Sequence, residues 1–132
     1  MGSISKVHFG SWKNRMLVAE REKRKERLII RMRGELDGSS VIQLSTLLGE
    51  AANSHIAHLT LDFSQILRFE YTGIALSVAV FEFYAEDFSE ITCCGLPQGI
   101  SKVFKGLGIQ KIPGLKIVPI DDGPEGVAVS NL

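Results

Sequence analysis

The sequence is short of several features that mark particular classes of protein. Its 15 Lys and Arg balance 15 Asp and Glu, so no excess of charge favours nucleic acid or an anionic membrane as the partner. No apolar run approaches the roughly 20 residues of a membrane-spanning helix, and the N-terminus lacks the apolar segment of a signal peptide. The 132 residues, 45% of them hydrophobic, suit one globular domain with a core. We therefore expect a cytoplasmic domain that neither binds nucleic acid nor inserts into a membrane.

Cysteine is scarce, and no group of residues has the pattern of a metal site. Cys93 and Cys94 are neighbours in an apolar run, where a strand would point them to opposite faces and keep them from bridging each other. This favours buried, reduced thiols over a redox site. His55 and His58 have the spacing of ligands on a helix, but no Cys, Asp or Glu cluster accompanies them. We expect no metal and no other cofactor.

The signatures of common enzymes are missing as well. The sequence has no Ser, His and acid in a hydrolase motif, and no glycine loop that would cradle a phosphate after a strand. The neighbouring carboxylates Asp121 and Asp122 stand in the C-terminal tail, away from any motif. We therefore expect a protein that is not an enzyme.

The residues that are present predict a hairpin near the N-terminus. Apolar-rich runs at 15–22 and 27–36 enclose the charged segment REKRKER, residues 21–27. In the second run apolar and polar residues alternate, which predicts a strand with one largely polar face. The charged segment mixes glutamates with its Lys and Arg and has no aromatic residue for stacking. This favours a solvated turn over a phosphate-binding site.

Helices and strands alternate in the rest of the chain. Apolar residues at helical spacing predict helices over 39–53, 72–86 and 97–108, and the remaining apolar runs predict strands over 55–64, 89–96 and 115–120. Such alternation is typical of a largely parallel sheet, to which the hairpin adds an antiparallel edge. The helix over 72–86 is apolar on nearly every side. It is therefore either the central helix of the domain or one that also meets a partner.

The order of these segments resembles the STAS family, the domain shared by sulphate transporters and anti-sigma factor antagonists. Its strongest marks are Gly34-Glu35-Leu36-Asp37, Leu61-Asp62-Phe63-Ser64 and Gly73, persuasive through their order and spacing. The similarity covers residues 15–120, which we expect to form the domain, after an irregular or partly ordered leader over 1–14 and before a tail over 121–132. It implies an α/β fold, a mixed sheet of four to five strands with an N-terminal antiparallel hairpin, backed by three to four helices.

The resemblance also indicates where the site lies. Antagonists of this family carry Asp-Ser-Ser-Gly before the long helix, and a kinase phosphorylates the first Ser. Anchored on Gly73, Glu70 aligns with the Asp, Tyr71 with the phosphorylated Ser and Thr72 with the second Ser. The residues that we expect to bind a partner are Asp37, Gly38, Ser39, Glu70, Tyr71, Thr72 and Gly73.

The replacement of the acceptor Ser leaves open how the site is controlled. Thr72 is either the N-cap of the helix, its hydroxyl accepting a hydrogen bond from a helical N–H, or a phosphorylation site that the helix N-terminus tolerates. Tyr71 is a poor acceptor for a kinase built around serine and fits a contact residue better. Glu70 is either a solvated turn residue or a permanently negative mimic of phosphate.

The function implied by the resemblance is that of an anti-sigma factor antagonist in bacterial partner switching, with an anti-sigma factor or a kinase as the protein partner. The missing Ser implies either constitutive binding or a switch moved to Thr72. The alternative is an accessory subunit that docks on the ATPase of a lipid-type membrane transport complex. A homodimer that buries the extra apolar face of the helix over 72–86 is compatible with both.

Overall fold

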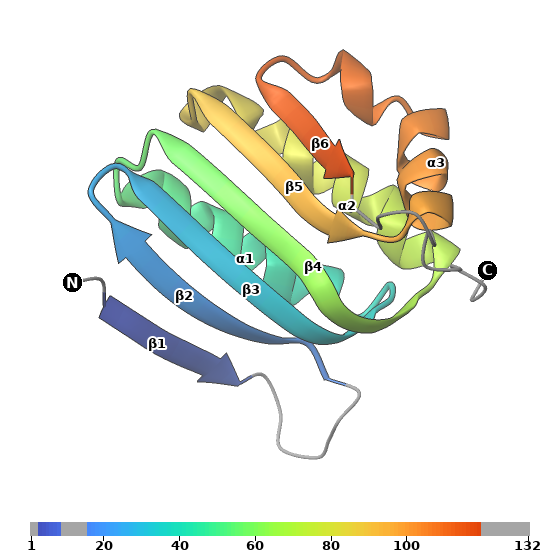
Figure 1. The fold of residues 1–132 in the computed structure, drawn as a ribbon, viewed down its shortest axis with the longest axis horizontal. Helices are drawn as coiled ribbons and strands as arrows, with labels where there is room; N and C mark the ends of the chain where they lie inside the picture. The colour runs from blue at the N-terminus through green and yellow to red at the C-terminus, as the bar shows by residue number, and fades with distance from the viewer. Residues whose placement is uncertain (1–2, 9–15, 120–132) are drawn as a thin grey trace, which may run out of the picture.

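The computed structural model describes residues 3–8 and 16–119, which form six strands and three α-helices (Figure 1). The strands are β1 (Ser3–His8), β2 (Val18–Arg24), β3 (Arg27–Leu36), β4 (His58–Phe69), β5 (Glu90–Leu96) and β6 (Leu115–Pro119). The helices are α1 (Val41–Asn53), α2 (Tyr71–Tyr84) and α3 (Gln98–Gly106), with short 3-10 helices η1 (Ala85–Asp87) and η2 (Ile109–Lys111). Strand order follows the chain from β1 to β6; the pairs β1-β2 and β2-β3 are antiparallel, and the later pairs are parallel.

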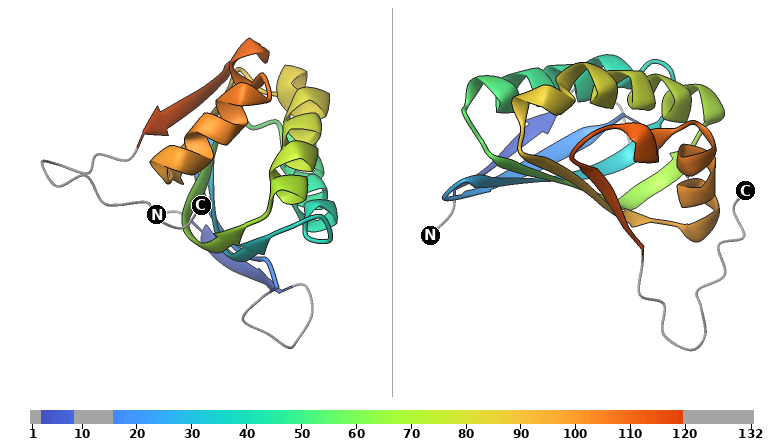
Figure 2. Two further views of the ribbon diagram at one scale, coloured as in Figure 1. Left: turned by 90° about the vertical axis from the view of Figure 1, so that its right-hand side faces the viewer. Right: turned by 90° about the horizontal axis from the view of Figure 1, so that it is seen from above.

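The helices lie on one side of the sheet. Helices α1 and α2 run side by side behind the sheet in Figure 1 and above it in the right-hand view of Figure 2. Helix α3 closes the end of this layer, where it contacts α2 and β6. The other face of the sheet is turned toward the viewer in Figure 1, and no helix of the described residues covers it. We call this the open face.

The core follows from the periodicity of the strands and helices. In β3, Leu28, Ile30 and Met32 are buried, while the residues between them are turned toward the open face. Helix α1 buries one stripe at helical spacing, formed by Val41, Leu44, Leu47, Leu48 and Ala51. Phe104 of α3 packs against Phe63 of β4 and Phe81 of α2, with ring centres 6.2 and 6.4 Å apart. One apolar core therefore joins the sheet to all three helices.

The predicted fold class is confirmed, with one more strand than expected. Helix predictions over 39–53, 72–86 and 97–108 correspond to α1, to α2 with η1, and to α3. Gly108, at a left-handed φ of 88°, follows the end of α3 as predicted. The sheet has six strands rather than four or five, because residues 3–8 of the predicted leader pair with β2. The predicted tail over 121–132 lies outside the described residues.

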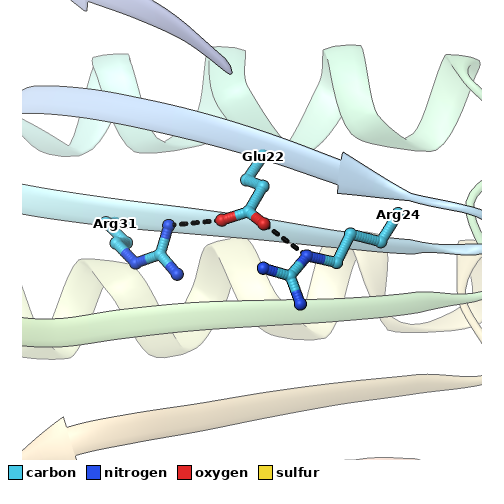
Figure 3. Close-up of polar contacts among 3 residues, drawn as sticks. All are labelled: Glu22, Arg24 and Arg31. Carbon is cyan, nitrogen blue, oxygen red and sulfur yellow. Dashed lines mark hydrogen bonds and ion pairs between the residues drawn. The ribbon is translucent and has the colours of Figure 1, made fainter. Parts of the chain in front are cut away.

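The charged segment at 21–27, predicted as a solvated turn, is exposed over 23–27 but buries Glu22. Only Lys25 and Glu26 lie between β2 and β3, and Lys25 takes a left-handed φ of 51°. Glu22 is 8% exposed on the open face, where its carboxylate accepts hydrogen bonds from Arg31 at 2.8 Å and from Arg24 (Figure 3). The prediction holds for residues 23–27, which are exposed, and is wrong for Glu22, because the antiparallel register places this glutamate between two arginines.

Strand β4 is longer than the strand predicted over 55–64. It begins at His58, passes a register shift against β3, and continues to Phe69. At the shift, the Asp62 carboxylate accepts a hydrogen bond from the Ser64 N–H at 2.9 Å. The pairing of β4 with β5 ends at Asp62, so the last part of β4 pairs with β3 alone. This extension carries the chain to the predicted site.

Candidate interaction site

The predicted site lies where the parallel strands β3 and β4 end. Their last register pair is Leu36 with Phe69, and the next residue, Glu70, donates its N–H to the Leu36 carbonyl at 2.9 Å. The loop over 37–40 leads from β3 into α1, and Glu70 leads from β4 into α2. Because both connections leave the same edge of the sheet, the two predicted segments meet.

Two glycines allow the start of α2 to press against the loop after β3. A Cβ on Gly73 would lie 2.5 Å from the Leu36 carbonyl oxygen and 2.7 Å from the Asp37 Cα, so no side chain fits there. A Cβ on Gly38 would lie 3.2 Å from Cγ2 of Thr72. The backbones therefore touch directly, and the loop and the helix start form one surface.

Hydrogen bonds fix the loop after β3. The Asp37 carboxylate accepts from the Ser39 N–H at 3.0 Å, the Ser39 hydroxyl at 2.7 Å and the Ser40 N–H at 2.9 Å. Ser40, which is buried, accepts from the Asp37 N–H through its hydroxyl at 2.9 Å. Partial burial of Asp37 opposes its ionisation, but the hydrogen bonds from Ser39 and Ser40 outweigh this and lower its pKa. The loop is thus held by an ionised Asp37.

The start of α2 differs from the prediction at one residue. Helix α2 begins at Tyr71, and Glu70 occupies the N-cap position without a side-chain capping hydrogen bond. The prediction of Thr72 as N-cap is therefore wrong: Thr72 is the second helical residue. Tyr71 is 63% exposed, Thr72 is exposed, and the Glu70 carboxylate lies 3.4 Å from a guanidinium nitrogen of Arg68.

The structure brings all seven predicted residues together at one end of the molecule, and we call them the junction surface: Asp37, Gly38, Ser39, Glu70, Tyr71, Thr72 and Gly73. Two residues near it were missed. Ser77 is buried and donates its hydroxyl to the Gly73 carbonyl at 2.7 Å, which satisfies the polar group inside the core. Leu67, on the extension of β4, is exposed although large and apolar. Neither stands out in sequence, because the predicted strand ended before Leu67 and Ser77 lies within an apolar helix.

The chemistry available elsewhere in the described residues is limited. Cys93 is buried and Cys94 half-buried, and burial raises the pKa of both thiols, so the prediction of two buried thiols holds fully only for Cys93. Residues 3–8 and 16–119 contain no group of three His, Cys, Asp or Glu arranged to hold a metal ion. In this same part of the chain, no helix has the length and apolar content to cross a membrane.

Comparisons with known proteins find likeness in structure rather than in sequence. No family model and no curated protein matches the sequence. The anti-sigma factor antagonist SpoIIAA in its unphosphorylated form is 18% identical, with a TM-score of 0.57 over 76% of this chain and 87% of that chain. An anti-sigma factor antagonist from Mycobacterium paratuberculosis is 16% identical, with a TM-score of 0.60 over 83% and 92% of the two chains.

A third structure names the fold directly. A DUF3478-family protein with a SpoIIAA-like fold, from Shewanella loihica, is 13% identical, with a TM-score of 0.57 over 89% of this chain and 96% of that chain. This chain has the SpoIIAA-like fold. The STAS-like architecture predicted from the sequence is thereby confirmed. Within the SpoIIAA-like fold of this chain, the junction surface lies at the carboxyl ends of β3 and β4.

Proposed function

We propose that this chain is a non-enzymatic regulatory domain that binds a partner protein through the junction surface, in the manner of an anti-sigma factor antagonist in bacterial partner switching. The partner is an anti-sigma factor or a kinase. One observation carries the proposal: the direct contact of Gly73 and Gly38 with their neighbours joins the loop over 37–39 and the start of α2 into a single surface, on which Ser39, Tyr71 and Thr72 are exposed. Solved structures of anti-sigma factor antagonists share the fold that presents this surface.

The junction surface has the physical properties of a protein-binding site. Its loop is held in one conformation by the hydrogen bonds of Asp37, so little conformational entropy is lost on binding. Tyr71 offers a large exposed aromatic side chain, the type of residue that most often anchors an interface. The expected role of Tyr71 is therefore contact with the partner rather than acceptance of phosphate.

Control of binding falls to Thr72 in this proposal. Its exposed hydroxyl stands at the second position of α2, where backbone N–H groups without helical partners accommodate a phosphate. A phosphate there would bring a charge of about −1.5 to −2 to the surface that the partner covers. The fold would survive, and the partner would be released by the cost of burying that charge.

The first experiment identifies the partner and locates its contact. The full-length chain is used to capture proteins from the native host, and the recovered partner is purified and titrated against variants. We expect Tyr71→Ala to weaken its affinity about tenfold or more. Val118→Ser, which alters an exposed residue of β6 on the open face, should leave the affinity unchanged. Recovery of a transport ATPase would replace the antagonist role by that of an accessory subunit, and equal effects of both substitutions would contradict the site.

The second experiment tests control at Thr72. Intact-mass measurement on protein from the native host, during growth and under stress, should find a phosphorylated species in one condition. Thr72→Glu should weaken partner binding, whereas Thr72→Val, which keeps the methyl group beside Gly38, should bind constitutively. Absence of the phosphorylated species in both conditions, or regulated binding by Thr72→Val, would exclude this switch.

A further inference from the structure

The outward side of α2 carries an apolar stripe that the described residues leave uncovered. Thr72, Leu76, Ala79 and Phe83 are exposed and follow one another at steps of four, three and four residues, which places them along one side of the helix. Leu76 is 44% and Phe83 77% exposed. Apolar residues at this spacing are the pattern through which helices pack on one another. We call these four residues the α2 stripe.

Acidic residues stand at the C-terminal end of the α2 stripe. Glu82, Glu86 and Asp87 are exposed, and residues 69–101 contain no Lys or Arg. The C-terminus of a helix carries partial negative charge, so acidic groups there disfavour α2 rather than stabilise it. Proteins tend to keep such locally unfavourable charges where they serve a function. These charges therefore suit a cationic partner.

A groove of about 380 Å³ opens beside the same acidic residues. Phe88 and Ile112, both buried, form part of its wall, and Glu82, Glu86 and Lys111 line it as well. Lys111 offsets one of the two glutamates, and Asp87 adds a further negative charge nearby. An apolar groove with carboxylates suits the aliphatic stem and charged head of a Lys or Arg side chain.

We infer that the α2 stripe docks an amphipathic helix of a partner protein, with apolar residues on the stripe and Lys or Arg side chains at Glu82, Glu86 and the groove. The inference rests on the proposed function and extends the junction surface, with which the stripe shares Thr72, along the length of α2. A second copy of this chain fits poorly. Packed parallel, Glu82 and Glu86 would meet their own copies; packed antiparallel, they would find no Lys or Arg on α2.

The test uses the full-length chain and two synthetic helical peptides of about three heptads, roughly 21 residues. Both carry Leu at the a and d positions; one has Lys at the flanking positions and the other Glu. Fluorescence anisotropy gives the affinity, and backbone amide chemical shifts locate the bound peptide. We expect the basic peptide to bind along α2, about tenfold or more tighter than the acidic one. Its affinity should weaken at high salt.

Variants separate the stripe from the rest of the surface. We expect the affinity for the basic peptide to fall about tenfold in each of three variants: Leu76→Ser, Phe83→Ser and the double charge reversal Glu82→Lys, Glu86→Lys. Val118→Ser is matched to Leu76→Ser, since Val118 is 43% exposed on β6, and Glu26→Lys in the hairpin turn is the control for the charge reversal. Both controls should bind as the unchanged chain does. Circular dichroism verifies that every variant is folded.

Several results would overturn the inference. One is equal affinity for the two peptides; another is an equal loss of affinity in the stripe variants and the controls. Chemical-shift changes away from α2 would also contradict the inference, as would a dimer of the chain that Phe83→Ser dissociates. The native partner distinguishes this failure from that of the proposed function. If Tyr71→Ala weakens the affinity for the native partner and Phe83→Ser does not, the inference about the α2 stripe is wrong and the proposed function still stands. If neither substitution weakens the affinity for the native partner, the proposed function is wrong as well.

Discussion

At the scale of single residues, Gly73 controls how closely α2 approaches β3. A methyl group there would lie 2.5 Å from the Leu36 carbonyl oxygen, so Gly73→Ala must push the helix start away from the loop. We expect a loss of about 1–3 kcal/mol in the free energy of unfolding, measured in urea, together with weaker partner binding. Gly106→Ala is the control, because a Cβ at this position of α3 would meet nothing within 4 Å. It should be neutral or stabilise by up to ~1 kcal/mol, and equal losses in the two variants would contradict the role of Gly73.

Glu22 is a second residue whose surroundings make a prediction. Hydrogen bonds from Arg31 and Arg24 lower its pKa, so it binds its proton less readily in the folded chain than in the unfolded one. Ionised Glu22 therefore stabilises the fold at neutral pH, and this contribution is lost as the pH falls below the ordinary pKa of a glutamate, about 4.3, and through the lowered pKa of Glu22. Glu22→Gln should be less stable than the unchanged chain at pH 7, and the difference should shrink toward pH 3. Thermal unfolding across this range measures it, with Glu26→Gln in the exposed turn expected to show no difference.

At the scale of secondary-structure elements, the start of α1 depends on Asp37. The N-cap position, Ser40, has no side-chain capping hydrogen bond, and the Asp37 carboxylate instead accepts the N–H groups of Ser39 and Ser40. Asp37→Ala should cost about 1 kcal/mol and speed amide hydrogen exchange in the first turn of α1. Asp37→Asn keeps an acceptor oxygen and should lose less. An Ala variant whose exchange in this turn is unchanged would show that the loop holds its shape without Asp37.

The helices and strands also show how much of the fold can be predicted from the sequence. The three helices were predicted to within about two residues at each end, because their apolar residues recur at helical spacing over nine residues or more. Strand β1 was missed, because SISKVH has too few apolar residues to signal a strand and becomes one by pairing with β2. The extension of β4 was missed because the alternation of buried and exposed residues breaks at Ser64 and Gln65, where the register shifts, and again at Leu67 and Arg68.

That the seven proposed residues lie together was predictable, but how they pack against one another was not. The seven residues came from the family resemblance, and the fold brings them together because parallel strands end at one edge. There is no room for even a methyl group at Gly73, because Leu36 and Asp37 lie so close to it. The sequence around Gly73 does not reveal this tertiary contact. The N-cap of α2 was misplaced because a hydroxyl residue before an apolar run favours a cap at Thr72, whereas the hydrogen bond from Glu70 to Leu36 starts the helix earlier.

At the scale of the whole molecule, α1 and α2 differ in charge from the rest of the helical layer and from the open face. Helices α1 and α2 contain Glu but no Lys or Arg, whereas α3 carries Lys102 and Lys105, and Arg31 and Arg24 pair with Glu22 on the open face. The junction surface and the α2 stripe both belong to the helical layer. A partner that engages them would therefore meet apolar and acidic groups and leave the arginines of the open face free.

The last prediction concerns β1, which forms the edge of the sheet beside β2. Strand β1 pairs with β2 at six register positions from Ser3 to His8, so a chain that starts at residue 15 would leave β2 as an open edge. We expect this truncated chain to be less stable by roughly 2 kcal/mol, since each backbone hydrogen bond contributes about 1 kcal/mol and the freed chain regains entropy. It should also self-associate through the edge of β2, although the charges on that strand limit this. Urea unfolding and analytical ultracentrifugation measure the two effects, and a synthetic peptide of residues 1–14 should reverse both. Unchanged stability would instead mean that the pairing of β1 with β2 adds nothing to the stability of the fold.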